Sequence, residues 1–257
     1  MENATHPCPT RQVPPRREEA RVPHVTEAIG DDGVVVLTLD RAPANAFDLA
    51  LLLELTAVMA RLAGDPPAAV VLTGAHGFFS AGADLAAPPI GPQGVVHIDE
   101  LLMGVFALTC PVIAAMAGHA VGIGFLATLA CDLRIASDAG RYGLNEVKLG
   151  FPHPLVNFDL LRATVSARAA STLLLGSELL DAATCAGLGI VDEVVAPDAV
   201  LPRALDAARH RGAMPAQPYA ETKGALRRPA LEAMHASLAA DVRAAAAAPA
   251  SARGPWR

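Results

Sequence analysis

Two glycine-rich segments hold the residues whose types and spacing suggest chemistry. Residues 77–85 read GFFSAGADL, and residues 118–132 read GHAVGIGFLATLACD. Each segment follows an apolar run typical of a strand, so each is predicted to form a strand-to-loop corner whose small residues leave backbone N–H groups uncovered. Two N–H groups that point at one spot form an oxyanion hole, which stabilises negative charge developing on a carbonyl oxygen. The alternative is a pair of tight turns whose small residues serve packing alone.

The second segment does not fit a phosphate-binding loop. A dinucleotide-binding loop needs the pattern G-x-G-x-x-G after the first strand, with an acidic residue about 20 positions further on. Here Gly122 and Gly124 are followed by Ala127 at the third glycine position, and the segment lies in the middle of the chain. Because a predicted helix begins at this corner, the partial positive charge of its N-terminus would reinforce the N–H groups.

The elements that must position these corners have the pattern of an α/β domain. Nearly continuous apolar runs, typical of strands covered on both faces, span 33–40, 68–73, 111–117 and 131–137. Helices are predicted over 48–64, with Asp48 as the N-cap, and over 154–176. Strands that alternate with helices favour an α/β fold. From about Leu201 the pattern is helical and Ala-rich, which predicts a small helical appendage packed on another surface.

The composition favours one large globular core. The chain has 257 residues, of which 53% are hydrophobic and 18% charged, and its formal net charge is −6. The acidic balance argues against a nucleic-acid partner. No run approaches the ~18 uncharged apolar residues of a membrane-spanning helix, so no membrane association is expected. The four cysteines have no CxxC pairing, which favours buried, reduced thiols in a cytoplasmic protein.

Both ends of the chain are predicted to be loose. Residues 1–22 are rich in proline and charge and lack the apolar core of a signal peptide, so we expect a disordered N-terminal extension. Residues 246–257 are of low complexity and are expected to form a flexible tail.

Several motifs in register resemble the crotonase (enoyl-CoA hydratase/isomerase) superfamily, closest to its Δ3,Δ2-enoyl-CoA isomerase branch. They read VVLTGAHGFFSAGADL, PVIAAMAGHAVGIGFLATLACDLRIAS, YGLNEVKLGF and AGLGIVDEVV, and DRAPANAFD matches more loosely. The resemblance runs from about Val35 to Val195. It implies a crotonase-like spiral of ββα units over residues 23–196, a C-terminal helical region over 197–245, and a homo-trimer or dimer of trimers.

The resemblance also assigns the oxyanion hole. Its two backbone N–H donors fall on Ala83 and Ile123, and together they would stabilise the enolate of an acyl thioester. Ile123 stands where most relatives have glycine. The substitution keeps the backbone N–H, but a β-branched residue requires a helix-like φ here, and its side chain would narrow the acyl pocket. No permanently bound cofactor and no metal are implied, since coenzyme A enters as part of the substrate.

The acid–base residues distinguish hydration from isomerisation. Hydratases that this chain resembles carry two glutamates, and their positions fall on Leu126 and Glu146. From spacing alone, Glu146 would be interpreted as a solvated or ion-paired loop carboxylate. The resemblance implies instead that Glu146 is the catalytic base. Leucine cannot activate water, so a single carboxylate favours moving a proton from the α carbon to the carbon two positions away. Burial against Leu126 and Phe151 is expected to raise the pKa of Glu146.

The expected substrate contacts lie at the corners. The set that would cradle the carrier and acyl group consists of Ala44, Ala46, Ala81, Asp84, Leu85 and Leu126. Many relatives carry basic residues at the positions of Ala44 and Ala86, so here either the cations of the C-terminal region (Lys223, Arg227 and Arg228) replace them or the acyl group arrives on a carrier protein.

Other polar residues and other reactions stay open. His119 and His153 are each expected to hydrogen-bond the backbone more readily than to act as a second acid or base, and Asn145 could orient Glu146. Asp99, with its neighbours in segment 86–105, is expected to be exposed. The alternatives to isomerisation are a decarboxylase or hydrolase with the same oxyanion hole, and a non-catalytic protein that binds an acyl carrier.

Overall fold

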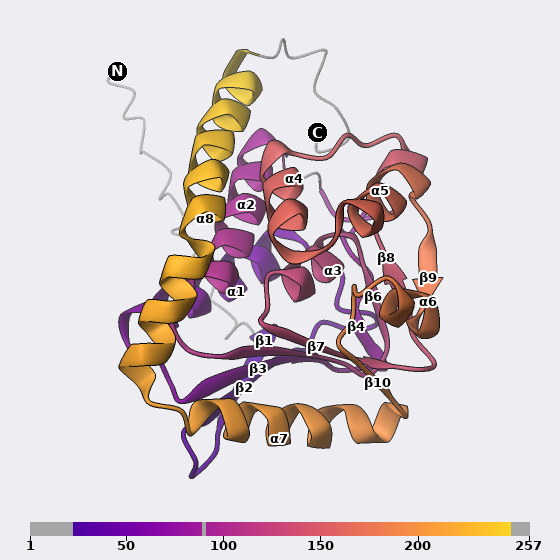
Figure 1. Cartoon of the computed structure of the whole chain (residues 1–257). Coiled ribbons are helices and arrows are strands. Elements are labelled where there is room, and N and C mark those ends of the chain that lie inside the picture. Colours follow the sequence, from indigo (N-terminus) through magenta and orange to yellow (C-terminus); the bar gives the residue numbers. More distant parts are fainter. Residues whose placement is uncertain (1–22, 89–90, 248–257) are drawn as a thin grey trace, which may run out of the picture.

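The computed structural model describes residues 23–88 and 91–247 and shows two β-sheets surrounded by helices (Figure 1). The larger sheet has six strands in the order β1-β2-β3-β5-β7-β10, all parallel except β1, which runs antiparallel to β2. Its strands are β1 (Val25–Ile29), β2 (Val34–Leu39), β3 (Ala69–Gly74), β5 (Val112–Met116), β7 (Leu133–Ser137) and β10 (Glu193–Val195).

The smaller sheet has four short strands in the order β4-β6-β8-β9, with β9 antiparallel to β8. They are β4 (Phe78–Ser80), β6 (His119–Val121), β8 (Arg141–Gly143) and β9 (Leu179–Asp181). The chain repeatedly places one strand in the large sheet and the next in the small sheet before a helix follows. Two such turns end in α2 (Gly91–Ala107) and α3 (Gly122–Leu129). The result is a spiral of ββα units, which confirms the predicted α/β class.

The four apolar runs singled out in the sequence form β2, β3, β5 and β7, as predicted. Val71 of β3 faces a second apolar cluster on the outer side of the sheet, whereas Val70 and Leu72 face the main core, so this strand is covered on both faces. The strands of the small sheet were not predicted. Each has only three residues, which is too short for a period-2 pattern to be recognised.

The helix predicted over 48–64 is confirmed. The single helix predicted over 154–176 is wrong, because this segment forms two helices. Helix α1 spans Leu49–Gly64, and the Asp48 side chain caps it by accepting a hydrogen bond from Leu51 N at 2.8 Å. Segment 154–176 forms two helices, α4 (Leu155–Thr164) and α5 (Ala167–Gly176). The chain turns at Ser166, whose hydroxyl accepts from Ala169 N at 3.1 Å and so begins a new helix.

The C-terminal helices pack on their own chain. After α6 (Ala182–Gly187) and β10, helix α7 (Val200–Gly212) lies along the face of the large sheet opposite to the other helices (Figure 1). Its small side chains Ala204 and Ala208 are fully buried there. Helix α8 (Ala216–Ala247) packs against α2 and α4. The predicted N-terminal extension lies outside the described residues, as does all of the predicted tail except 246–247, which end α8.

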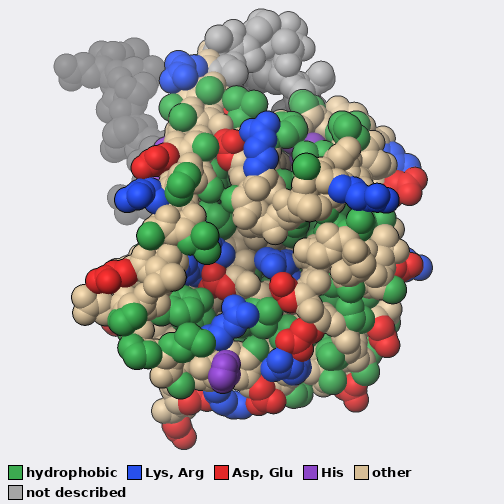
Figure 2. Space-filling view, in the orientation of Figure 1, with side chains coloured by type: hydrophobic (Ala, Val, Ile, Leu, Met, Phe, Trp, Pro, Cys, Tyr) green, Lys and Arg blue, Asp and Glu red, His purple; other side chains and the backbone are tan. Residues whose placement is uncertain are grey.

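The exposed charges are mixed in sign. Figure 2 shows acidic and basic side chains interspersed on the face that carries α7 and α8, with apolar side chains between them. Among the described residues, no helix combines the length and apolarity needed to cross a membrane.

Candidate active site

The two glycine corners meet in the folded chain. Gly82, which follows β4, has φ of +89°, and Gly122, which opens α3 after β6, has φ of +56°. A Cβ on Gly82 would lie 3.1 Å from Val121 O and 3.7 Å from Gly122 Cα. The two backbones are therefore in van der Waals contact, and glycine supplies both the positive φ and the space for this approach.

The amides expected to form the oxyanion hole adjoin this contact. Phe47 pairs with Ala83 in a parallel bridge by bonding to Gly82 O and Asp84 N, so the N–H of Ala83 points away from that segment. Ile123 is the second residue of α3, and its N–H belongs to the first helical turn, where no intrahelical acceptor exists. Within the described residues neither N–H donates a hydrogen bond, so both are available to a ligand.

Ile123 has the backbone conformation that its branched side chain requires. It lies within α3, and the positive φ values of this corner belong to Gly122 rather than to Ile123. Gly124, one residue later, is required for another reason, because a Cβ there would lie 2.4 Å from the Ser80 side chain. The glycines on either side of Ile123 thus serve the turn and the packing.

The first corner is held rigidly by the N-terminal segment. Ala81 N donates to Ala44 O at 2.9 Å, and the Ser80 hydroxyl donates to Asn45 O at 2.7 Å. Arg41 binds the carboxylate of Asp84 at 2.7 Å and also donates to Ala46 O at 2.9 Å. These bonds bring together every small residue that the sequence assigned to the substrate cradle. They also place Asp84 in an ion pair, and Arg41 lowers its pKa.

A cavity of about 110 Å³ opens where the corners meet. Both corners contribute to its wall, together with the loop that follows β8. It is lined by Ala81, Gly82, Ala83, Leu85, Gly122, Ile123, Asn145, Glu146, Leu149 and Phe151. One carboxylate and two uncovered amides therefore share one small cavity.

Glu146 is the carboxylate of this cavity. It precedes the short 3₁₀ helix η1 (Val147–Leu149), and its side chain is only 8% exposed. Burial raises its pKa to about 7, and the backbone N–H groups of Asn145 and Glu146 partly counter that rise. A Cβ placed on Gly122 would lie 3.3 Å from Glu146 Oε1, so this oxygen lies against the second corner. The expected raised pKa is confirmed, and its cause is desolvation.

Leu126 lies one turn after Ile123 and is 1% exposed within the main core. The cavity wall includes Ile123 but not Leu126, so a contact between Leu126 and an acyl group stays a prediction. Since no second carboxylate lines the cavity among the described residues, Glu146 has no partner of the kind that the resemblance placed at this position.

The two histidines have different surroundings. His119 Nδ1 accepts a hydrogen bond from Arg141 N at 3.1 Å, which is the structural role expected for it. His153 is 3% exposed, and its Nε2 lies 3.9 Å from Glu146 Oε2. Residues 146–153 do not form a continuous helix, so their seven-residue spacing predicts no contact, and the proximity depends on the turn after η1.

Two expectations about charged residues are wrong. Asp99 is fully buried on α2 instead of exposed, and burial raises its pKa to about 8. Lys223 and Arg227 do not face a substrate: both bind the carboxylate of Asp132 at 2.7 Å and are largely buried beneath α8. They therefore do not replace the missing phosphate partners at the corners, because their side chains are buried and engaged with Asp132 within the fold. Arg228 is exposed.

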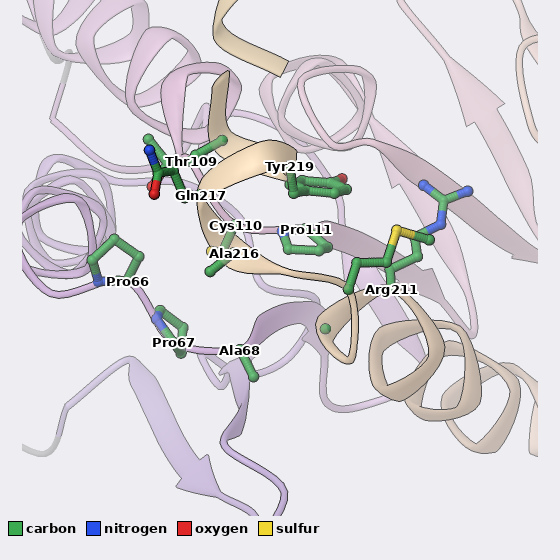
Figure 3. Close-up of a pocket in the computed structure, with 13 residues that line it drawn as sticks. Pro66, Pro67, Ala68, Thr109, Cys110, Pro111, Arg211, Ala216, Gln217 and Tyr219 are labelled. Atoms are coloured by element: carbon green, nitrogen blue, oxygen red, sulfur yellow. The ribbon is translucent and has the colours of Figure 1, made fainter. Parts of the chain in front are cut away.

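A larger cavity of about 280 Å³ lies elsewhere, between the segments that precede β3 and β5 and the start of α8 (Figure 3). Arg211, Tyr219 and Cys110 contribute its polar groups. Burial raises the pKa of Tyr219 to about 12 and that of Cys110 to about 11, so both are protonated near neutral pH. The cavity therefore lacks a group that could remove a proton near neutral pH, and the smaller cavity at the corners is the candidate active site.

The remaining candidate groups are cysteine thiols and possible metal ligands. Cys110, Cys131 and Cys185 are free and buried, as predicted, and the predicted thiol of Cys8 lies outside the described residues. In the described part of the chain, no three His, Cys, Asp or Glu side chains are placed to hold a metal ion.

The spiral of paired strands, the converging corners and the long C-terminal helix define a crotonase-fold protein. The chain belongs to the enoyl-CoA hydratase/isomerase family, whose sequence profile matches residues 30–253. It is therefore a member of a family of enzymes, and the resemblance seen in the motifs is confirmed.

Individual relatives also support membership of this family, and their names give two activities, hydratase and isomerase. The chain is 32% identical over 185 residues to a probable enoyl-CoA hydratase, EchA17, of Mycobacterium tuberculosis, covering 68% of this chain and 70% of that protein. It is 36% identical over 179 residues to a putative enoyl-CoA hydratase of Thermus thermophilus, covering 66% and 70%. The structure of human mitochondrial Δ3-Δ2-enoyl-CoA isomerase superposes with a TM-score of 0.79 at 31% identity, covering 86% of this chain and 90% of that one.

Proposed function

We propose that this protein isomerises the double bond of an enoyl thioester from the Δ3 to the Δ2 position. The observation that carries the proposal is one buried carboxylate, Glu146, facing two uncovered amides across a small cavity. The family name and the human isomerase fold both fit an acyl-CoA substrate. Hydration is disfavoured because Leu126 stands at the position of the first hydratase glutamate.

The proposed reaction needs one base and one oxyanion site. The thioester oxygen accepts hydrogen bonds from Ala83 N and Ile123 N, which stabilise the enolate as charge develops. Glu146 removes a proton from C2, the C–H electron pair enters the enolate, and the same proton returns to C4. A pKa of about 7 suits this exchange, because the carboxylate can both accept and release the proton near neutral pH.

The backbone around residues 44–46 and 83–85 is proposed to hold the carrier portion of the substrate. Hydrogen bonds from Ala81 N to Ala44 O and from Asp84 N to Phe47 O join the two segments and pre-form this surface. Because Lys223 and Arg227 are engaged with Asp132, coenzyme A would bind mainly through backbone groups and the apolar side chain of Leu85, which is 64% exposed. An acyl-carrier-protein substrate is the alternative, and the homo-trimer or dimer of trimers stays a prediction.

The test compares 3-enoyl-CoA isomerisation by the wild type and by Glu146→Gln, which keeps the size and removes the base. We expect kcat to fall by about 10²- to 10⁴-fold, the usual contribution of a positioned general base. Glu232→Gln, an exposed change on α8, serves as the matched control and should keep full activity. Full activity in Glu146→Gln would refute the assignment of the base.

Parallel assays separate the rival reactions. Incubation with a 2-enoyl-CoA measures hydration, and a malonyl-type thioester measures decarboxylation, which forms the enolate without a base. If decarboxylation exceeds isomerisation and survives Glu146→Gln, the oxyanion hole serves that reaction instead. Absence of turnover, together with absence of α-proton exchange from a saturated acyl-CoA in deuterated water, would indicate a non-catalytic binding protein.

A further inference from the structure

Glu146 and His153 face each other in a buried site. Their side chains are 8% and 3% exposed, and 3.9 Å separates Glu146 Oε2 from His153 Nε2. Among the described residues, neither of these two atoms has a hydrogen-bond partner. Buried polar atoms are almost always paired, so this pair of unsatisfied atoms calls for a function. Hydrogen bonds at catalytic sites are often long without substrate and shorten when it binds.

The proton of the His153 ring is placed by Asn157. Asn157 Nδ2 lies 3.3 Å from His153 Nδ1, and with the amide in this orientation Nδ2 donates and Nδ1 accepts. Burial lowers the pKa of His153, which keeps the ring neutral. A neutral imidazole that accepts at Nδ1 carries its hydrogen on Nε2, the atom that faces Glu146. The ring of Phe158 packs edge-on against the imidazole, with 6.3 Å between ring centroids, and limits its rotation.

The two carboxylate oxygens of Glu146 therefore lie in different surroundings. Oε1 lies against the oxyanion corner at Gly122, and Oε2 lies toward the Nε2–H of His153. The pKa of neither Glu146 nor His153 is shifted by a charged side chain.

Charged groups on the elements around α4 are engaged elsewhere. On α8, Asp241 accepts a hydrogen bond from Leu155 N at 2.7 Å. On α2, the charge of Asp241 contributes to the raised pKa of Asp99. Asp159 on α4 itself binds Ser237, and Lys148 on η1 is exposed. None of these groups competes with His153 for Glu146 Oε2.

We propose that His153 is a positioning residue for Glu146: when substrate binds, its Nε2–H closes on Oε2 of the carboxylate and holds it, so that Oε1 alone exchanges the proton with the substrate. This inference rests on the proposed function of Glu146 as the base. The proton moves from C2 to Oε1 and from Oε1 to C4, while His153 neither gains nor loses one. A donor on Oε2 favours the charged form of Glu146 and fixes the plane of its carboxylate between the two carbons.

Two substitutions at one position test the proposal. His153→Phe keeps an apolar ring and removes the donor, whereas His153→Gln keeps a donor where Nε2 lies. We expect His153→Phe to lower kcat by about tenfold to hundredfold, the effect of losing a hydrogen bond to a charged group, with little change in KM. His153→Gln should recover most of this loss. The exposed change His235→Phe on α8 is the matched control.

A readout that needs no turnover separates this proposal from the proposed function. The pKa of Glu146, measured with a saturated acyl-CoA bound by NMR titration of its labelled carboxyl carbon, should rise in His153→Phe and return toward the wild-type value in His153→Gln. Nitrogen NMR of the wild type should show the His153 hydrogen on Nε2. An unchanged Glu146 pKa in His153→Phe, or a hydrogen on Nδ1, would overturn the role of His153 and leave the isomerase proposal intact. Full isomerase activity in Glu146→Gln would refute both.

Discussion

Gly122 is the residue at which the backbone of the second corner meets the candidate base. Its φ of +56° starts α3 in the direction that aims the Ile123 amide at the cavity, and the missing side chain leaves room for Glu146 Oε1. The same residue therefore determines the direction of one proposed oxyanion donor and limits the position of the carboxylate. The other corner depends in the same way on Gly82.

Gly122→Ala is expected to lower isomerase kcat by about tenfold to hundredfold. The new Cβ would lie 3.3 Å from Glu146 Oε1 and displace it, and small displacements of catalytic groups carry effects of this size. Gly189→Ala is the matched control, because Gly189 also has a positive φ (+68°) and a Cβ there meets no atom within 4 Å. Steady-state kinetics of both variants provide the measurement. Equal activity in the two variants would contradict the proposed position of the carboxylate.

The activity should depend on the ionisation of Glu146. Burial raises its pKa to about 7 from a model-compound value of 4.5, so below pH 7 the carboxyl is protonated and cannot accept the C2 proton. We expect kcat/KM to rise about tenfold per pH unit on the acidic side and to level off above pH 7. A profile between pH 4 and 9 measures this, and an inflection near pH 4.5 would show that the pKa of the base is not raised.

At the scale of elements, α2 contains a buried carboxyl group that has no hydrogen-bond partner among the described residues. Asp99 is fully buried, and neither of its carboxylate oxygens has a hydrogen-bond partner within the described residues. Desolvation raises its pKa to about 8, and the charges of Asp241 and Glu100 add to the rise. The folded state therefore holds Asp99 protonated at pH values where the unfolded chain ionises it.

Asp99→Leu is expected to increase the free energy of unfolding by about 1–3 kcal/mol, the usual cost of an unsatisfied buried polar group. The folded pKa is raised, so the stability contribution of Asp99 is present at low pH and is lost as the pH rises toward 8. The gain from leucine should therefore grow between pH 4 and pH 8. Urea unfolding at several pH values measures it, with Glu232→Gln on α8 as the exposed control. A loss of stability at pH 8 would show that Asp99 is paired.

At the scale of the whole molecule, one buried ion cluster fastens the C-terminal helix to the spiral core. Lys223 and Arg227 of α8 both bind Asp132, which also accepts a hydrogen bond from Val112 N at 2.7 Å. Arg227 additionally donates to Phe106 O at 2.6 Å and lies over that ring. The cluster therefore joins α8, α2, β5 and the start of β7 at one point.

Lys223→Met is expected to destabilise the fold by about 3 kcal/mol, because it leaves part of the Asp132 charge buried without its partner. The exposed substitution Arg228→Met removes the same charge from the same helix and should change stability by less than about 0.5 kcal/mol. Thermal and urea unfolding of the two variants give the comparison. A similar small effect in both would show that the cluster contributes little to holding α8.

The sequence by itself determined four strands of the large sheet and the expected chemistry of the corners. Continuous apolar runs predicted β2, β3, β5 and β7, since strands covered on both faces need apolar residues at every position. Small residues at the ends of two strands predicted uncovered amides. The resemblance of the motifs to the family predicted that Glu146 is the base. These features are local, because each depends on residues close together in the chain.

Only the tertiary structure decided which polar groups are buried together. The approach of His153 to Glu146 depends on the turn after η1, and the burial of Asp99 and Lys223 depends on how α2 and α8 pack. These contacts produce no periodic pattern in the sequence. In addition, charged residue types predict exposure rather than burial. Desolvation sets the pKa of Glu146, and pairing with Asp132 engages the C-terminal cations. Both arise from contacts between segments far apart in sequence. Spacing along the chain does not encode them.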